Sequence, residues 1–192
     1  MVNFPGKINT AVFISGRGSN LKSLIKYSNT KKSLIKIALV ISDNSNAKGL
    51  EYANKSKIKN IFIKYYNRSK FENRALRLLK KKNVDLICLA GFMKILSGSF
   101  IKSFYKPILN IHPSLLPKYK GLNTHNRVIK NKEKYSGATV HIVDRRLDSG
   151  KIILQKKVKI IKSESGQSLE KKVLKIEHEI YPKAIIRLLT SY

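Results

Sequence analysis

The sequence predicts an α/β fold: a Rossmann-like, doubly wound, mostly parallel sheet with an antiparallel C-terminal strand pair and a long final helix. Apolar, β-branched runs alternate with segments of helical periodicity over the first 90 residues, which is the pattern of strands covered by helices on both faces. Two strand-like runs then follow each other closely, as antiparallel neighbours do. No internal repeat or linker separates these parts, so residues 1–192 are expected to form a single domain, with halves at about 1–100 and 101–192.

In the first half, strands and helices are expected in strict alternation. An apolar run over residues 8–15 stops at a glycine-rich turn, after which Ser19 or Asn20 can cap a helix. Further strands are expected at residues 35–41, 61–63 and 84–90. The intervening helices are expected near residues 47–56 and where Phe71, Ala75, Leu78 and Leu79 fall at helical spacing.

In the second half, strands and helices no longer alternate strictly. A short strand at residues 108–111 runs into a proline-punctuated loop at 112–121. Strands are expected at 138–143 and 152–158, with a turn at 145–150 between them. The last helix carries Leu169, Val173, Ile176, Ile180, Ala184 and Leu188, and Pro182 is expected to kink it.

Composition excludes several classes of protein. No apolar run reaches the roughly 20 residues needed to cross a bilayer, and the amino end has no apolar signal region. A single cysteine, Cys88, forms no internal disulfide and is expected in the core, so a reduced, cytoplasmic protein is predicted. Of the histidines, His141 is expected to be core packing and His178 to be a surface residue or one with its hydrogen bonds satisfied, while His125 is left open. Their spacing favours no metal site.

The net charge of +29 is the most prominent feature of the composition. Such a charge attracts polyanions, nucleic acid above all. However, 32 of the 40 basic residues are lysines, they are scattered along the chain, and no basic stretch carries interleaved aromatic residues. Since Lys, Ile and Asn share AT-rich codons, we interpret the charge as compositional drift. No specific nucleic-acid partner and no membrane partner are expected, and a small anionic substrate would gain from the same field.

A glycine-rich turn follows the first expected strand. Gly16-Arg17-Gly18-Ser19-Asn20 lets the backbone approach an anion, and the N–H groups that begin the next helix can donate to it. The turn lacks the third glycine of a dinucleotide fingerprint and the lysine of a P-loop. It therefore favours a monophosphate site over a pyrophosphate site, the alternative being an ordinary tight turn.

An amide and an imidazole end the strand at 108–111. Asn110 and His112 lie two residues apart, so their side chains point to the same side, towards the crevice where open α/β sheets bind ligands. Together they can hydrogen-bond a developing oxyanion and move a proton. Asp148, at the tip of the turn at 145–150, would on its own be only a turn residue.

In combination, these segments resemble the folate-dependent phosphoribosylglycinamide formyltransferases of the formyltransferase superfamily. The loop Asn-x-His-Pro-Ser-Leu-Leu-Pro at 110–117, paired with Leu-Asp-x-Gly at 147–150, is typical of the superfamily, and Gly-x-Gly-Ser-Asn at 16–20 of the glycinamide branch. Residues 89–96, 137–155 and 176–182 extend the resemblance over almost the whole chain.

The resemblance implies transfer of the formyl group from 10-formyltetrahydrofolate, a co-substrate, to the amine of glycinamide ribonucleotide in purine biosynthesis. It assigns catalysis to Asn110, His112 and Asp148, with an ionised Asp148 raising the pKa of His112. It assigns the phosphate and ribonucleotide to Gly18, Ser19, Asn20 and Glu177, and the folate to Arg68, Met93, Lys94, Ile95, Leu96 and Asn110. It implies no metal and a monomer or weak homodimer.

Four positions depart from the family pattern: Arg17, Asn123, Ser149 and Lys151. The last two follow the expected catalytic aspartate and put the shape of its turn in question. Two other branches of the superfamily, methionyl-tRNA formyltransferase and formyltetrahydrofolate deformylase, carry an extra carboxy-terminal or amino-terminal domain. The positions of the matched segments in this chain favour the glycinamide branch over both.

Overall fold

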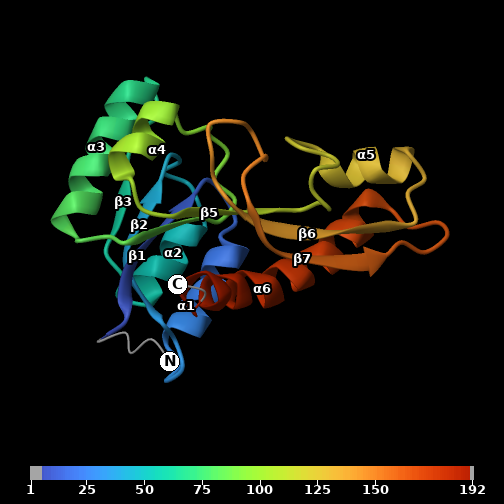
Figure 1. Ribbon diagram of the computed structural model, residues 1–192, viewed down its shortest axis with the longest axis horizontal. Helices are drawn as coiled ribbons and strands as arrows, with labels where there is room; N and C mark the ends of the chain where they lie inside the picture. The colour runs from blue at the N-terminus through green and yellow to red at the C-terminus, as the bar shows by residue number, and fades with distance from the viewer. Residues whose placement is uncertain (1–5, 191–192) are drawn as a thin grey trace. The chain divides into compact units, whose positions relative to one another are not determined.

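A computed structural model of the chain describes residues 6–190 (Figure 1). The elements, in order, are β1 (Ile8–Ile14), α1 (Ser19–Ser28), β2 (Ile35–Ser42), α2 (Gly49–Lys55), β3 (Asn60–Phe62), α3 (Arg68–Lys81), β4 (Leu86–Leu89), α4 (Gly98–Phe104), β5 (Ile108–His112), α5 (Thr124–Lys130), β6 (Tyr135–Ile142), β7 (Ile152–Lys159) and α6 (Gly166–Thr190). No helix in residues 6–190 is both long enough and apolar enough to span a membrane.

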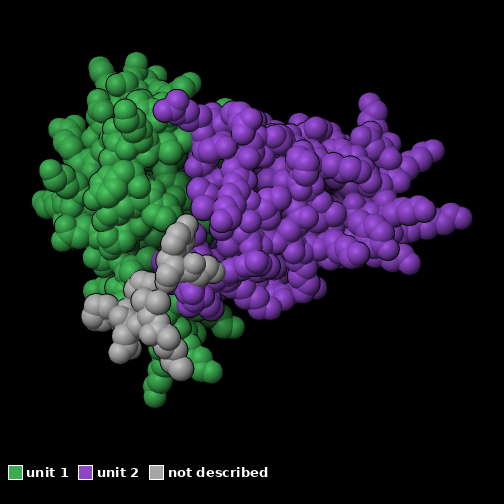
Figure 2. Space-filling view, viewed as in Figure 1, with its two compact units in different colours: residues 1–109, 192 green, residues 110–191 purple. Residues whose placement is uncertain are grey.

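The chain divides into two compact units, coloured separately in Figure 2. The first ends at Leu109 and the second begins at Asn110, so the division falls within β5. The order of hydrogen-bonded strands is β3-β2-β1-β4-β5-β6-β7. This order confirms the predicted doubly wound fold class, and it makes β5 the strand that belongs to both units.

In the first unit, β1 lies between β2 and β4 and is parallel to both. β2 is also parallel to β3. Residues 11–14 of β1 and all of β4, Cys88 included, are buried, as expected for strands covered on both faces. Leu21, Leu24 and Ile25 of α1 are buried too, at the spacing that turns one face of a helix to the core.

In the second unit, β6 and β7 are antiparallel, as predicted. Helix α6 packs against both strands, and its ribbon runs alongside them in Figure 1. Its buried residues recur at helical spacing from Leu169 to Leu188. Pro182 lies inside the helix, which continues for eight further residues to Thr190.

The structure has two helices that the sequence reasoning missed, α4 and α5. Each is seven residues long, the same length as α2, which the sequence did predict, so short length alone does not account for the omission. Ser97 gives α4 a recognisable start, because its hydroxyl accepts the Phe100 N–H at 3.0 Å. Strand β6 also begins three residues before the expected position, at Tyr135.

Candidate active site

The end of β5 presents Asn110 and His112, two residues apart on one strand. The His112 side chain is 7% exposed, and Asn110 is half-buried. The two-residue spacing that predicted a shared direction is borne out by their partners, since both side chains lie beside Asp148. The end of β5 therefore places an amide and an imidazole beside one carboxylate.

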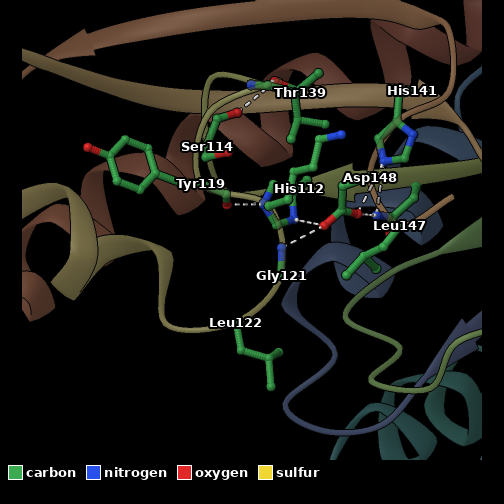
Figure 3. A network of polar contacts seen from close by, with 12 residues as sticks. His112, Ser114, Tyr119, Gly121, Leu122, Thr139, His141, Leu147 and Asp148 are labelled. Carbon is green, nitrogen blue, oxygen red and sulfur yellow. Dashed lines mark hydrogen bonds and ion pairs between the residues drawn. The ribbon is translucent and has the colours of Figure 1, made fainter.

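Asp148 lies at the centre of this cluster (Figure 3). Its Oδ2 is 3.4 Å from His112 Nδ1 and accepts the Gly121 N–H at 2.9 Å. Its Oδ1 is 3.5 Å from Asn110 Nδ2 and 3.6 Å from His141 Nε2. The backbone at Asp148 is left-handed, with φ of 47°, a conformation that a non-glycine residue keeps only when its surroundings hold it.

His141 joins this cluster, which corrects the expectation that it only packs in the core. Its Nε2 lies 3.2 Å from Asn110 Nδ2, and its Nδ1 lies 2.9 Å from the Ile142 carbonyl oxygen. Its side chain is 2% exposed. The sequence did hold a signal: alternation along β6 places His141 on the same face as Thr139, whose hydroxyl donates to Ser114 O at 2.6 Å in the loop after β5.

The His112 ring has an acceptor at each nitrogen. Its Nε2 lies 2.8 Å from Tyr119 O, opposite the Asp148 contact at Nδ1 (Figure 3). Burial lowers the pKa of His112, and this outweighs the upward effects of the Tyr119 carbonyl and the Asp148 charge. The expectation of a raised pKa is therefore wrong for this structure, because sequence reasoning counted the nearby carboxylate but not the cost of burying an imidazolium.

Asp148 shows the opposite balance. Burial acts to raise its pKa, but the His141 hydrogen bond, the Gly121 N–H and the two imidazoles together lower it below the usual value. The carboxylate is thus ionised at neutral pH. A buried carboxylate beside two imidazoles can accept a proton itself, or it can stabilise a proton that one of the rings carries.

The glycine-rich turn lies in the first unit, between β1 and α1. Gly18 has φ of 72°, and a Cβ at this position would lie 2.4 Å from Gly49 Cα. Both facts require glycine here. The Ser15 N–H donates to Gly91 O, and the Met93 N–H donates to Ser15 Oγ at 2.9 Å. These bonds bring the turn beside residues 91–96, at the carboxyl ends of neighbouring strands β1 and β4, where open sheets bind ligands.

In residues 93–96, the expected folate wall, the first three residues are exposed and the fourth is buried. Met93 and Ile95 are 63% and 57% exposed, whereas Leu96 is buried. Lys94 lies with its ammonium 3.9 Å from Asp43 Oδ2 and 5.1 Å from the centre of the Tyr65 ring. The segment therefore presents two apolar side chains and one cation to solvent, and turns its fourth residue into the core.

The remaining expected contacts lie elsewhere within each unit. Arg68 begins α3, is exposed, and lines a cavity of about 350 Å³ together with residues of α4 such as Ser99 and Ser103. Glu177 is a buried residue of α6. Among residues 6–190, no group of three or more His, Cys, Asp or Glu side chains is placed to hold a metal ion.

Comparisons with known proteins identify the family. The formyl transferase family matches residues 8–185. A phosphoribosylglycinamide formyltransferase of Haemophilus influenzae is 42% identical over 91% of this chain and 84% of its own length. A trifunctional purine biosynthetic protein of Bos taurus is 41% identical over 94% of this chain, but the chain spans only 18% of that protein.

Solved structures of proteins with related names are also similar to this chain. The crystal structure of a phosphoribosylglycinamide formyltransferase from Anaplasma phagocytophilum has a TM-score of 0.88 at 40% identity, covering 93% of this chain and 84% of that one. A glycinamide ribonucleotide transformylase from Symbiobacterium toebii has a TM-score of 0.90 at 36% identity, with coverage of 93% and 86%. The chain therefore belongs to the formyl transferase family, and its relatives include proteins named phosphoribosylglycinamide formyltransferase.

Proposed function

We propose that this formyltransferase moves the formyl group of 10-formyltetrahydrofolate to the amine of glycinamide ribonucleotide. The observation that carries the proposal is the gathering of Asn110, His112 and Asp148 at the end of β5, three groups suited to acyl transfer and separated by up to 38 residues in sequence. The similarity to proteins named for this reaction supports the choice of substrates.

Each side chain has a defined task in such a transfer. The substrate amine attacks the formyl carbon, and the new negative charge develops on the formyl oxygen. Asn110 Nδ2 supplies a donor for that oxygen, and a protonated His112 supplies a second from Nε2 when this nitrogen exchanges its contact with Tyr119 O for the substrate. Asp148 is ionised and beside the ring, so it stabilises the imidazolium that forms.

The proton balance follows from the same geometry. As the C–N bond to the ribonucleotide forms, the amine loses a proton. As the bond to the folate nitrogen breaks, that nitrogen gains one. His112 enters as a neutral base because burial lowers its pKa, so it can accept the first proton, directly or through water, and return it to the leaving nitrogen.

The substrate-holding residues are proposed unit by unit. In the first unit, Gly18, Ser19 and Asn20 begin α1 and supply backbone donors suited to a phosphate. Exposed Met93 and Ile95 offer apolar surface for the flat ring system of the folate. The Lys94 and Arg68 cations suit the carboxylates of the folate. Leu96 would act from the core as support. In the second unit, Glu177 is proposed as a ribonucleotide contact.

The test combines purified protein with both substrates and follows the absorbance change of the folate. We expect formylated glycinamide ribonucleotide and tetrahydrofolate in equal amounts. Omitting the ribonucleotide is the control for hydrolysis of the formyl donor, the activity of a deformylase. A folded protein that releases formate at the same rate with and without the ribonucleotide would overturn the proposal, as would one with no turnover.

A further inference from the structure

A lysine outside the expected site links the two segments that surround Asp148. The Lys120 ammonium donates to Ser149 Oγ, and the Ser149 hydroxyl donates in turn to Leu147 O at 2.9 Å. A hydroxyl can accept and donate at once, so both bonds can exist together. Leu147 and Ser149 flank Asp148 in sequence, so Lys120 binds the turn on one side of the carboxylate and reaches the other side through the Ser149 hydroxyl.

The residue after Lys120 holds the carboxylate itself. The Gly121 N–H donates to Asp148 Oδ2 at 2.9 Å. Two consecutive residues of one segment therefore bind the Asp148 turn, one through its side chain and one through its backbone. The Gly121 N–H is the direct contact of this pair with the carboxylate, and the Lys120 ammonium holds the turn that carries the carboxylate.

The backbone around this contact is held in an unfavourable conformation. Tyr119, Gly121 and Asp148 all have positive φ, at 58°, 76° and 47°. For a non-glycine residue the left-handed region is sterically unfavourable, so contacts with other residues must keep Tyr119 and Asp148 in it. Tyr119 also carries the carbonyl that contacts His112 Nε2, so the position of this segment affects both partners of the imidazole.

Helix α5 holds the same segment from its other end. Arg127 Nη1 donates to Lys120 O at 2.6 Å and lies 3.3 Å from Leu122 O. The guanidinium also lies 5.4 Å from the centre of the Tyr119 ring. Residues 119–122 are thus fixed to α5 by Arg127 and to the Asp148 turn by Lys120, which makes Lys120 the side chain that transmits the position of the segment to the turn.

We propose that Lys120 and Ser149 are positioning residues, which act on the reaction by holding the Gly121 N–H and the Asp148 carboxylate in register beside His112. The proposal rests on the proposed function for its kinetic consequences. It also gives the departure at Ser149 a role: its hydroxyl provides the acceptor that a glycine could not. Neither residue is assigned a contact with a substrate.

The test replaces Lys120 with Met, which keeps most of the stem but removes the ammonium. Displacing a catalytic group by a fraction of an ångström to 1 Å costs up to about 10²-fold, so we expect Lys120→Met to lower kcat about 10-fold with both KM values within about twofold. Lys120→Arg, which restores a donor, should recover part of kcat. Lys118→Met is the matched control, because Lys118 pairs with Glu133 at 3.0 Å instead, and its kcat should stay near wild type.

Ser149→Ala should lower kcat to a similar extent, and adding it to Lys120→Met should cost little more, because the two residues act through one bond. A kcat for Lys120→Met within about twofold of wild type, or fully multiplicative losses in the double variant, would overturn the proposal.

A second readout separates this proposal from the proposed function. The Gly121 amide proton, observed by NMR, should resonate downfield because it donates to a carboxylate, and should move upfield in Lys120→Met but not in Lys118→Met. An unchanged Gly121 resonance would refute the positioning role even if the wild-type protein catalysed no formyl transfer. If the wild-type protein were inactive but the Gly121 resonance still moved upfield in Lys120→Met, the positioning role would be upheld and only the proposed reaction rejected.

Discussion

At the scale of single residues, the central feature is that the surroundings favour a neutral His112 beside an ionised Asp148. Burial keeps His112 neutral more readily than in water, whereas its neighbours keep Asp148 ionised. Yet both acceptors around the ring, Tyr119 O and Asp148 Oδ2, favour a second proton on it. These effects oppose each other on one ring: burial disfavours the charged imidazole and lowers its pKa, and the two acceptors act to raise it.

The two residues should therefore act as one unit, and their variants should not be additive. Asp148→Asn keeps the shape and removes the charge, so the pKa of His112 should fall further and kcat should drop about 10²–10⁴-fold, the usual cost of one positioned acid or oxyanion partner. His112→Ala with Asp148→Asn should be little worse than His112→Ala alone. The measurement is kcat for both single variants and the double, with folding checked by circular dichroism.

A matched variant controls for the loss of charge at a distance. Asp144→Asn removes a carboxylate just before the turn at 145–150, where Asp144 Oδ1 accepts the Arg146 N–H at 2.8 Å. It should leave kcat nearly unchanged. If the losses at His112 and Asp148 multiplied in full, Asp148 would not act through His112, and its assigned role would be wrong.

At the scale of elements, the β1–α1 turn shows how packing limits what a mutation can test. Any side chain at Gly18 would meet the backbone of Gly49, and the positive φ adds about 1 kcal/mol of strain. Gly18→Val would therefore unfold part of the protein as well as weaken binding of the substrate phosphate. Its kinetic effect could not be interpreted as loss of phosphate binding alone.

Ser19→Ala is the sharper test of the phosphate loop. Ser19 begins α1 and is half-buried, and loss of its hydroxyl removes a donor without adding volume. We expect the KM for the ribonucleotide to rise about 10-fold, the value of one hydrogen bond to a charged group, with the folate KM unchanged. Ser56→Ala, at the exposed end of α2, is the control. Equal rises in both KM values would argue against a phosphate role for this turn.

The elements also show what could be predicted from sequence. β1, β2 and β4 were recognisable because burial on both faces leaves continuous apolar runs, and Asn110 and His112 could be placed together because a strand repeats every two residues. Helices α4 and α5 were not predicted, although they are as long as the predicted helix α2. Tyr119 O and Gly121 N are backbone groups, so no residue type marks them, and their contacts with His112 and Asp148 depend on loop geometry alone.

At the scale of the whole molecule, the scattered histidines predict how stability depends on pH. Burial lowers the pKa of His112, His125 and His178 in the folded protein. The unfolded chain therefore binds more protons than the folded one as the pH falls through the ordinary histidine value of 6.5. Stability rises with pH wherever the unfolded state binds more protons, so the contribution is fully present above that value and is lost on acidification.

We accordingly expect the melting temperature to fall by about 2–4 °C between pH 7.5 and 5.5, equivalent to about 1 kcal/mol for a chain of this size. The measurement is calorimetry across this range. His178→Gln should flatten the slope, because burial lowers the pKa of His178 and glutamine carries no titrating group. Mutual repulsion of the surplus lysines would instead give a slope that salt suppresses and that His178→Gln leaves intact. That result would show that net charge, rather than buried histidine, governs the response of this molecule to acid.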